Sequence, residues 1–90
     1  MGKTLKTTVQ FKKDMKRIKK SGKSPEKLWS LIEMLLQGEI PPQQFKPHTL
    51  SGNWRGYWEC HIEPDWLLIY RKGEEELTLI RTGSHAQLFK

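Results

Sequence analysis

Three histidines and one aspartate in the C-terminal half are the residues best suited to chemistry in this chain. His48 lies in a segment rich in proline and glycine, His61 precedes a turn, Asp65 follows that turn, and His85 lies in the last segment. A histidine side chain titrates near pH 6.5 when unperturbed, so two of them can act as general base and general acid at neutral pH. The set predicts proton-transfer chemistry, provided that the fold brings the four residues together.

The same four residues offer an alternative, because His and Asp side chains are also ligands for zinc or iron. No pair among them has the short spacing of two ligands on one helix. The single cysteine, Cys60, excludes a multi-cysteine zinc finger and an intramolecular disulfide. We therefore expect metal-independent chemistry without a cofactor. The sequence also lacks a phosphate-binding loop, a dinucleotide glycine pattern and the nucleophile elbow of serine hydrolases.

Charge is unevenly placed along the chain, which carries a formal net charge of +6. Residues 1–27 hold ten basic and two acidic residues, whereas residues 28–90 hold six basic and eight acidic ones. A basic half favours a polyanionic partner, although a solvated helix face that keeps a small protein soluble would look the same. No apolar run is long enough to span a membrane, so we expect a cytoplasmic protein without membrane contact.

A basic chain with several histidines and no expected metal fits the chemistry of RNA cleavage. The substrate supplies its own nucleophile, the 2′-hydroxyl, and a general base takes the proton from it. A cation stabilises the transition state, and a general acid protonates the leaving 5′-oxygen, which leaves a 2′,3′-cyclic phosphate. Aromatic side chains such as Tyr57, Trp66 and Phe89 could stack on splayed bases.

The periodicity of the sequence indicates the elements that must position these residues. Residues 4–9 alternate loosely and predict a strand. A narrow apolar stripe then predicts a very basic helix from Phe11, which should end at Gly22 in a left-handed cap. A Ser-Pro-Glu start predicts a second amphipathic helix from Pro25 to just before Gly38. Two helices joined by a few residues should form an antiparallel hairpin.

The remaining residues predict a long loop and a meander of strands. Residues 39–53 should form an irregular loop, and strands should follow in residues 54–62, 65–70 and 77–82. The order is β-α-α-β-β-β, an α+β fold in which the helix hairpin packs on one face of a small, twisted, mainly antiparallel sheet. The length predicts a single domain over residues 1–90.

Alternation within the meander predicts which side chains share a face, if His61 lies opposite Trp66. One face would then be aromatic and ionisable, and the other would be apolar and covered by the helices. The first face would collect Tyr57, Glu59, His61, Trp66, Tyr70 and Arg81. The second would collect Trp58, Cys60, Ile62, Leu67, Ile69 and Ile80. A shift of one residue in the strand pairing would move the side chains of one strand to the opposite face.

Three segments resemble the YafQ branch of the RelE superfamily of bacterial type II toxins. They read HTLSGNW from His48, CHIEPDWLLIY from Cys60 and RTGSHAQLF from Arg81. The resemblance spans nearly the whole chain and implies one RelE-like domain. It also implies a ribosome-dependent mRNA interferase that cuts translated mRNA in the ribosomal A site. A cognate antitoxin would neutralise it, and operator DNA would be bound only through the complex with that antitoxin.

The resemblance also implies roles for particular residues. The catalytic cluster would consist of His48, His61, Asp65 and His85, supported by Phe89. His85 is the leading acid/base candidate, and which residue is its partner stays open. Arg81 would hold the scissile phosphate. Further substrate contacts are expected from Trp66, and from Lys12, Lys16 and Lys19 on the basic helix, which would contact ribosomal RNA.

Two other function classes stay open at this point. Scaffolds of this superfamily also occur in toxins that inhibit gyrase without ribonuclease activity, so the fold alone does not fix the function. The chain could also be a non-catalytic RNA-binding module. The discriminating feature is the set of histidines with Asp65, which neither alternative needs.

Overall fold

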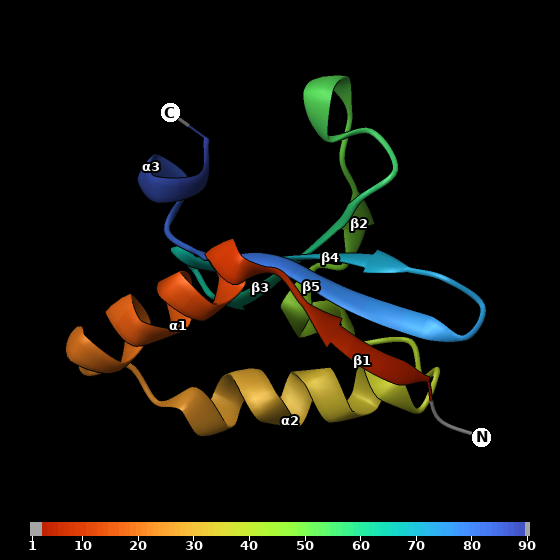
Figure 1. Ribbon diagram of the computed structural model, residues 1–90, viewed down its shortest axis with the longest axis horizontal. Coiled ribbons are helices and arrows are strands. Elements are labelled where there is room, and N and C mark those ends of the chain that lie inside the picture. The colour runs from red at the N-terminus through yellow and green to blue at the C-terminus, as the bar shows by residue number, and fades with distance from the viewer. Residues whose placement is uncertain (1–2, 90) are drawn as a thin grey trace.

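The computed structural model describes residues 3–89 and contains a five-stranded sheet with a pair of helices on one face (Figure 1). The strand order is β1-β5-β4-β3-β2; β1 is parallel to β5, and the other pairs are antiparallel. The strands are β1 (Thr4–Thr7), β2 (His48–Thr49), β3 (Trp58–Glu63), β4 (Trp66–Lys72) and β5 (Glu76–Gly83). This arrangement confirms the predicted α+β class and the mainly antiparallel sheet.

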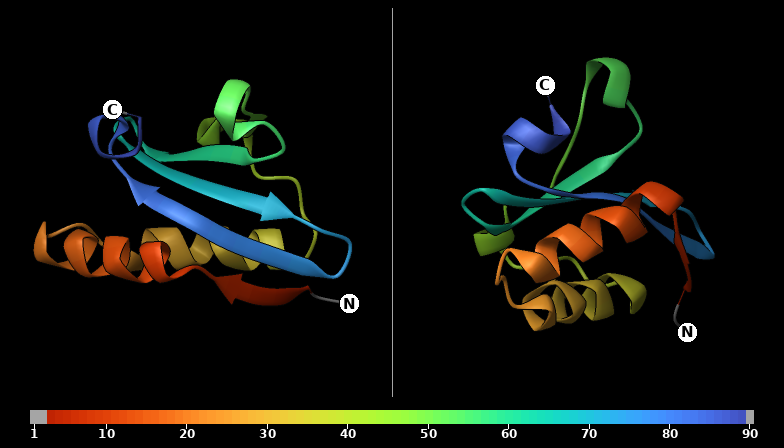
Figure 2. Two further views of the ribbon diagram at one scale, coloured as in Figure 1. Left: turned by 45° about the horizontal axis from the view of Figure 1, so that its top comes forward. Right: turned by 60° about the vertical axis from the view of Figure 1, so that its left-hand side comes forward.

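Helices α1 (Val9–Lys20) and α2 (Pro25–Leu36) run in opposite directions beneath the sheet, as the predicted hairpin requires (Figures 1 and 2). The apolar stripe of α1, from Phe11 to Ile18, is buried, and its lysines face outward. Gly22 follows α1 with φ +82° and Gly38 follows α2 with φ +78°. Glycine adopts this left-handed conformation without strain, which is why both helices end where the sequence predicts.

The segment predicted as an irregular loop is partly ordered. It contains two short 3₁₀ helices, η1 (Gln43–Phe45) and η2 (Gly52–Trp54), and the short strand β2 between them. The following strand begins at Trp58 and not at Trp54, because residues 52–54 turn and Gly56 has φ +93°, which interrupts an extended chain. The short strand places His48 beside β3, where it pairs with Glu59.

The predicted pairing between the first two strands of the meander is wrong by one residue. Glu63 pairs with Trp66 across the turn, and a bulge between His61 and Glu63 leaves His61 opposite Leu67. One extra residue in a strand shifts the pairing by one position, so the side chains of the partner strand that were expected on one face of the sheet lie on the other. Trp66 and Tyr70 therefore lie on the side covered by the helices, whereas Leu67 and Ile69 lie on the opposite side.

Each face of the sheet has its own apolar cluster. The larger cluster lies between the sheet and the two long helices and contains Cys60, Trp66, Leu68 and Tyr70, so Cys60 packs as predicted. The smaller cluster lies on the other face and has Leu67, Ile69 and Leu88 at its centre, with Leu50, Trp54, Tyr57 and Ile80 packed around them. It supports residues 50–57 and the short helix α3 (His85–Leu88), which both rise from this face (Figures 1 and 2).

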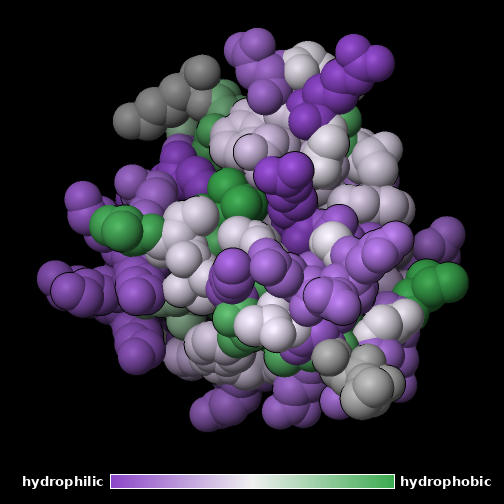
Figure 3. All heavy atoms as spheres, turned by 45° about the vertical axis from the view of Figure 1, so that its right-hand side comes forward, coloured by the Kyte–Doolittle hydropathy of each residue, from purple (hydrophilic) through white to green (hydrophobic). Residues whose placement is uncertain are grey.

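The surface is mainly polar. On the face that Figure 3 shows, hydrophilic and intermediate residues predominate, and apolar residues form small, separate patches. Among residues 3–89, no helix has the length and apolar character needed to span a membrane.

Candidate active site

Three histidine rings form a row on the sheet face opposite the long helices. His48 comes from β2, His61 from β3 and His85 from the first residue of α3. The ring centroids of His48 and His61 are 5.9 Å apart, as are those of His61 and His85. Phe89 continues the row, with its ring 6.1 Å from that of His85. The structure thus brings together the histidines that sequence analysis selected, although the first and the last are 37 positions apart in the chain.

His85 is held at both its backbone and its ring. Its backbone N–H donates to Asp65 Oδ1 over 3.1 Å, and its ring atom Nδ1 lies 3.2 Å from the same oxygen. These two hydrogen bonds, from the backbone and from the ring of His85, lower the pKa of Asp65. Because an ionised carboxylate can only accept, Nδ1 carries a hydrogen, and Nε2 remains for a substrate.

A capping box fixes the start of α3. The Ser84 side chain accepts from the Gln87 backbone N–H, and the Gln87 side chain accepts from the Ser84 backbone N–H. Gly83, immediately before, has φ +156°, and a Cβ there would lie 2.6 Å from Gln87 Oε1. Glycine at position 83 therefore lets the chain turn from β5 into the helix that presents His85.

Glu59 links the other two histidines and is the site residue that sequence analysis missed. Its Oε1 lies 3.0 Å from His48 Nε2 and 3.5 Å from His61 Nε2, and its side chain is only 5% exposed. Alternation placed Glu59 on the same face as His61, which was the available signal. That a glutamate would be buried could not be read from the residue type, because most glutamates are exposed.

The hydrogen bonds of His48 constrain its protonation. Its Nδ1 lies 2.7 Å from the backbone oxygen of Lys46. A carbonyl oxygen only accepts, so Nδ1 must carry the hydrogen of this bond. A hydrogen bond between His48 Nε2 and Glu59 Oε1 then needs a proton on one of these two atoms. A proton on either atom would lie between the two residues, beside the row of rings.

The same three residues also have the arrangement of a metal-ligand set. One ligand atom from each of His48, Glu59 and His61 lies within 4.8 Å of the others. The second carboxylate oxygen of Glu59 is buried without a hydrogen-bond partner among the described residues. Two imidazoles and one carboxylate suit zinc or copper. This set differs from the alternative considered from sequence, because Asp65 and His85 are engaged with each other instead.

Arg81 lies at the edge of the site and is paired with a buried acid. Its Nε and Nη2 donate to the two oxygens of Asp14 over 3.1 and 3.0 Å, and this side-chain pair raises the pKa of Arg81. Burial by itself would raise the pKa of Asp14, but the hydrogen bonds from Arg81, Gln10 and Thr82 outweigh it and lower the pKa. Arg81 and Glu59 both pair with Ile69, so they lie in one row of the sheet.

The prediction that Trp66 contacts the substrate is wrong. The residue is completely buried among the helices, and its indole N–H donates to Thr82 Oγ1 over 2.9 Å. The bulge after His61 is the cause, because it turns Trp66 to the opposite face. Besides Phe89, Trp54 supplies an aromatic ring near the site, 5.9 Å from the ring of Phe89.

The three lysines selected for RNA contact lie apart from the histidines. Lys12, Lys16 and Lys19 are exposed on α1, on the side of the helix that faces away from the core. Because α1 packs on one face of the sheet and the histidines lie on the other, the basic surface and the acid/base cluster are spatially distinct (Figure 1).

The chain is similar to a family of bacterial toxins. Residues 3–90 match the family model described as "Bacterial toxin of type II toxin-antitoxin system, YafQ". The chain is similar to "mRNA interferase toxin YafQ" of Escherichia coli K12, with 43% identity over 81 residues, which are 89% of this chain and 88% of the relative.

Solved structures agree with the sequence comparison. The chain resembles the toxin in the crystal structure of the E. coli DinJ-YafQ toxin-antitoxin complex, with a TM-score of 0.92, 38% identity and complete coverage of both chains. It also resembles a metal-bound toxin from Helicobacter pylori, with a TM-score of 0.90 and 35% identity over 99% of this chain and all of that chain. A copper-bound mutant toxin from the same species is similar as well, with a TM-score of 0.92, 38% identity and coverage of 99% of this chain and all of that chain.

Proposed function

Because this chain belongs to the YafQ family of type II toxin-antitoxin toxins, we propose that it cuts translated mRNA in the ribosomal A site by metal-independent acid/base catalysis. Family membership makes the chain an endoribonuclease toxin and gives it a cognate antitoxin as partner. It also decides against the gyrase-inhibiting and non-catalytic alternatives. The observation that carries the proposal is the row of three histidine rings, which holds two separately anchored acid/base groups.

His85 and the His48–Glu59 pair are the two proton-transfer groups in this mechanism. The Nδ1 of His85 faces Asp65 and the side chain is 54% exposed, so its Nε2 can exchange a proton with the substrate. At the other end of the row, His48 Nε2 and Glu59 Oε1 lie 3.0 Å apart, close enough to share a proton. One group removes the proton from the 2′-hydroxyl and the other protonates the leaving 5′-oxygen, so that a 2′,3′-cyclic phosphate and a 5′-hydroxyl result. His61, between them, lies beside the reacting phosphate.

Arg81 supplies the cation that this reaction needs. Glu59 and Arg81 lie two strands apart in one row, so their backbones are separated by roughly 10 Å at the usual strand spacing. A phosphate between the histidines and the guanidinium can contact both. Phe89, 36% exposed, and the adjacent Trp54 provide the aromatic surface on which a splayed base can stack.

A transition metal would compete with this chemistry. The H. pylori toxins were crystallised in copper-bound and metal-bound forms. Here His48, Glu59 and His61 offer three ligand atoms. A metal held by these atoms would occupy the nitrogen lone pairs that proton transfer needs. We therefore propose that such an ion inhibits the enzyme and is not its cofactor.

The basic surface of α1 is the part of the chain that would meet the ribosome. Lys12, Lys16 and Lys19 are exposed, and none of them takes part in an ion pair within residues 3–89. Exposed lysines attract RNA phosphates in a salt-dependent manner. An acidic antitoxin segment would be drawn to the same half of the chain, so ribosome and antitoxin could compete for it.

The experiment that tests the ribosomal part of the proposal compares one mRNA as free RNA and on translating ribosomes. We expect cleavage only when the message is translated. Charge reversal of Lys12, Lys16 and Lys19 should raise the ribosome concentration needed for half-maximal cleavage about tenfold, given the salt-dependent affinity of phosphate contacts. Charge reversal of Lys6 and Arg71, which lie elsewhere on the surface, is the control. Equal cleavage of free and translated RNA would contradict the proposal.

A further inference from the structure

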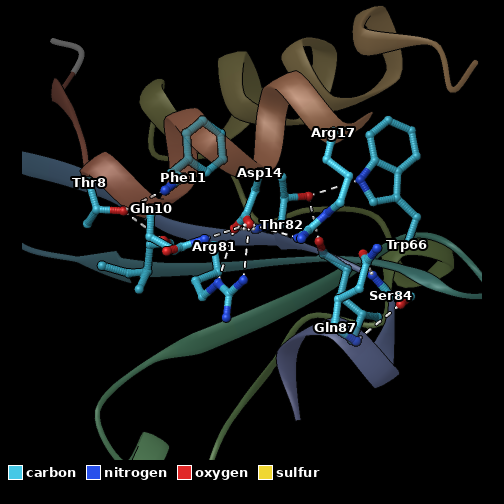
Figure 4. A network of polar contacts seen from close by, with 12 residues as sticks. Thr8, Gln10, Phe11, Asp14, Arg17, Trp66, Arg81, Thr82, Ser84 and Gln87 are labelled. Carbon is cyan, nitrogen blue, oxygen red and sulfur yellow. Dashed lines mark hydrogen bonds and ion pairs between the residues drawn. The ribbon is translucent and has the colours of Figure 1, made fainter. Parts of the chain in front are cut away.

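Asp14 is a completely buried carboxylate that the mechanism above does not use. Its two oxygens accept five hydrogen bonds, which Figure 4 shows converging between α1 and β5. Oδ1 accepts from Gln10 over 3.1 Å, from Arg17 over 2.8 Å and from Arg81 Nη2 over 3.0 Å. Oδ2 accepts from Arg81 Nε and from the Thr82 backbone N–H, each over 3.1 Å.

The bonds to Arg81 fix one edge of its guanidinium. Nε and Nη2 bind the two oxygens of Asp14 as a planar fork, which defines the orientation of the group as well as its position. Arginine has five N–H donors, so this fork leaves three for another ligand. The side chain is 22% exposed, and in Figure 4 the guanidinium points from β5 toward the side of the sheet on which α3 lies.

The charge balance of this cluster leaves Arg81 able to attract an anion. Asp14 carries one negative charge, whereas Arg17 and Arg81 each carry a positive charge. The Arg17 side chain is 43% exposed, and its Nη2 would lie 3.5 Å from a Cβ at Gly83. The single carboxylate therefore orients two guanidinium groups without neutralising both of them.

Asp14 also has a structural role, which must be separated from a role in the reaction. β1 pairs with β5 only as far as Leu79, and beyond that point side chains replace the strand at this edge, beginning with Thr8 Oγ1, which donates to the Ile80 carbonyl. Asp14 accepts from the Thr82 backbone N–H at this edge. Thr82 in turn donates to the Leu67 carbonyl and accepts from Trp66. A neutral acceptor at position 14 would still accept the hydrogen bond from the Thr82 backbone N–H. An ionised carboxylate is needed to bind the Arg81 guanidinium through both of its oxygens.

We propose that Asp14 is a positioning residue for the cleavage reaction, which clamps Arg81 so that the unbound edge of its guanidinium meets the scissile phosphate. This inference rests on the proposed role of Arg81. Through Asp14, helix α1, which carries the basic surface, would orient a residue of the site on the other face of the sheet. Asp14 does not touch the substrate and acts only through Arg81.

Four variants separate the positioning role from the structural one. Asp14→Asn keeps an acceptor for Thr82 but loses the charged fork, and Arg81→Ala removes the group being positioned. Arg81→Lys keeps the charge without the fork, and it remains informative if Asp14→Asn fails to fold. Gln10→Ala removes a neutral donor to the same carboxylate and is the matched control. Thermal melting verifies that each variant is folded, and the cleavage rate is measured at saturating and at limiting concentrations of mRNA-programmed ribosomes.

We expect Asp14→Asn and Arg81→Lys to lower the maximal cleavage rate about ten- to a hundredfold, because misplacing a transition-state contact by an ångström has costs of this order. The half-saturating ribosome concentration should change little, and Gln10→Ala should retain activity. In the Arg81→Ala background, Asp14→Asn should cause no further loss, because both changes remove one function.

Three results would overturn the inference. Full activity in folded Asp14→Asn or in Arg81→Lys, with Arg81→Ala inactive, would contradict the clamp but leave the role of Arg81 intact. A loss in the double variant equal to the product of the single losses would show that Asp14 acts independently of Arg81. Full activity in Arg81→Ala would contradict the proposed phosphate contact itself, and the inference with it.

Discussion

His48 and Glu59 face each other across the β2–β3 ladder, with His48 Nε2 and Glu59 Oε1 3.0 Å apart. The side chain of Glu59 is almost fully buried, and one of its oxygens has no hydrogen-bond partner within residues 3–89. A buried carboxylate is costly unless charges or donors face it. Glu59 Oε1 faces both imidazoles, so this carboxylate links two histidines of the row.

Replacement Glu59→Gln tests whether this carboxylate serves the reaction. Glutamine keeps the shape of the side chain but cannot share a proton with His48. We expect the cleavage rate to fall about ten- to a hundredfold, less than the 10²–10⁴ that a general acid or base itself contributes. The same exchange at Glu74, in the exposed β4–β5 turn, is the control. A folded Glu59→Gln variant with the full rate would remove Glu59 from the mechanism.

Replacement Gly83→Ala tests whether the capping box of α3 positions His85. The added Cβ would lie 2.6 Å from Gln87 Oε1 and must displace the side chain that caps Ser84. We expect a loss of about 1–2 kcal/mol in the free energy of unfolding, which is typical of a lost cap, together with lower activity. Gly73→Ala, where the nearest atom would be 3.5 Å away, is the matched control. Equal activity in both variants would contradict this role of α3.

Transition-metal ions provide a test of the metal-independent mechanism. We expect Zn²⁺ or Cu²⁺ to bind the chain and to inhibit cleavage, and His48→Ala to weaken that binding, measured by calorimetry without ribosomes. A chelator selective for transition metals, which leaves Mg²⁺ on the ribosome, should restore the inhibited rate. The same chelator should leave the uninhibited rate unchanged. Loss of activity in the chelator alone would mean that the enzyme needs a metal.

The buried Asp14 predicts a specific loss of stability in acid. Its hydrogen bonds lower its pKa in the folded chain, so its ionised form is stabilised by folding. This contribution is fully present above the unfolded value of about 3.9 and is lost as the pH falls through the lower folded value. The melting temperature of the wild type should therefore fall more steeply below about pH 4 than that of Asp14→Asn. Parallel curves for the two proteins would contradict the assignment.

Local signals explain what could be predicted from the sequence. The helices were predictable because their apolar period and their terminal Ser-Pro and Gly residues act over a few positions. The faces of β4 were not, because they depend on a single bulge next to Ile62 that no neighbouring residue type reveals. Asp14 was not recognised either, because its partner Arg81 lies 67 residues away.

In the candidate site, too, some residues could be predicted from the sequence and others could not. Its histidines could be selected by residue type, since histidine is the residue suited to proton transfer near neutral pH. Glu59 and Trp66 could not be assigned, because their roles depend on burial. Burial depends on how the strands pair. The observed pairing places Trp66 in the core and Glu59 between two histidines.

In the proposed mechanism, the histidine row cuts mRNA at the codon in the ribosomal A site. Primer extension on a translated message, with wild type beside folded His85→Ala and His61→Ala, tests it most directly. We expect cuts in register with the reading frame, 5′ fragments that end in a 2′,3′-cyclic phosphate, and no cuts with either variant. Cuts that ignore the reading frame, or undiminished cleavage by His85→Ala, would contradict it.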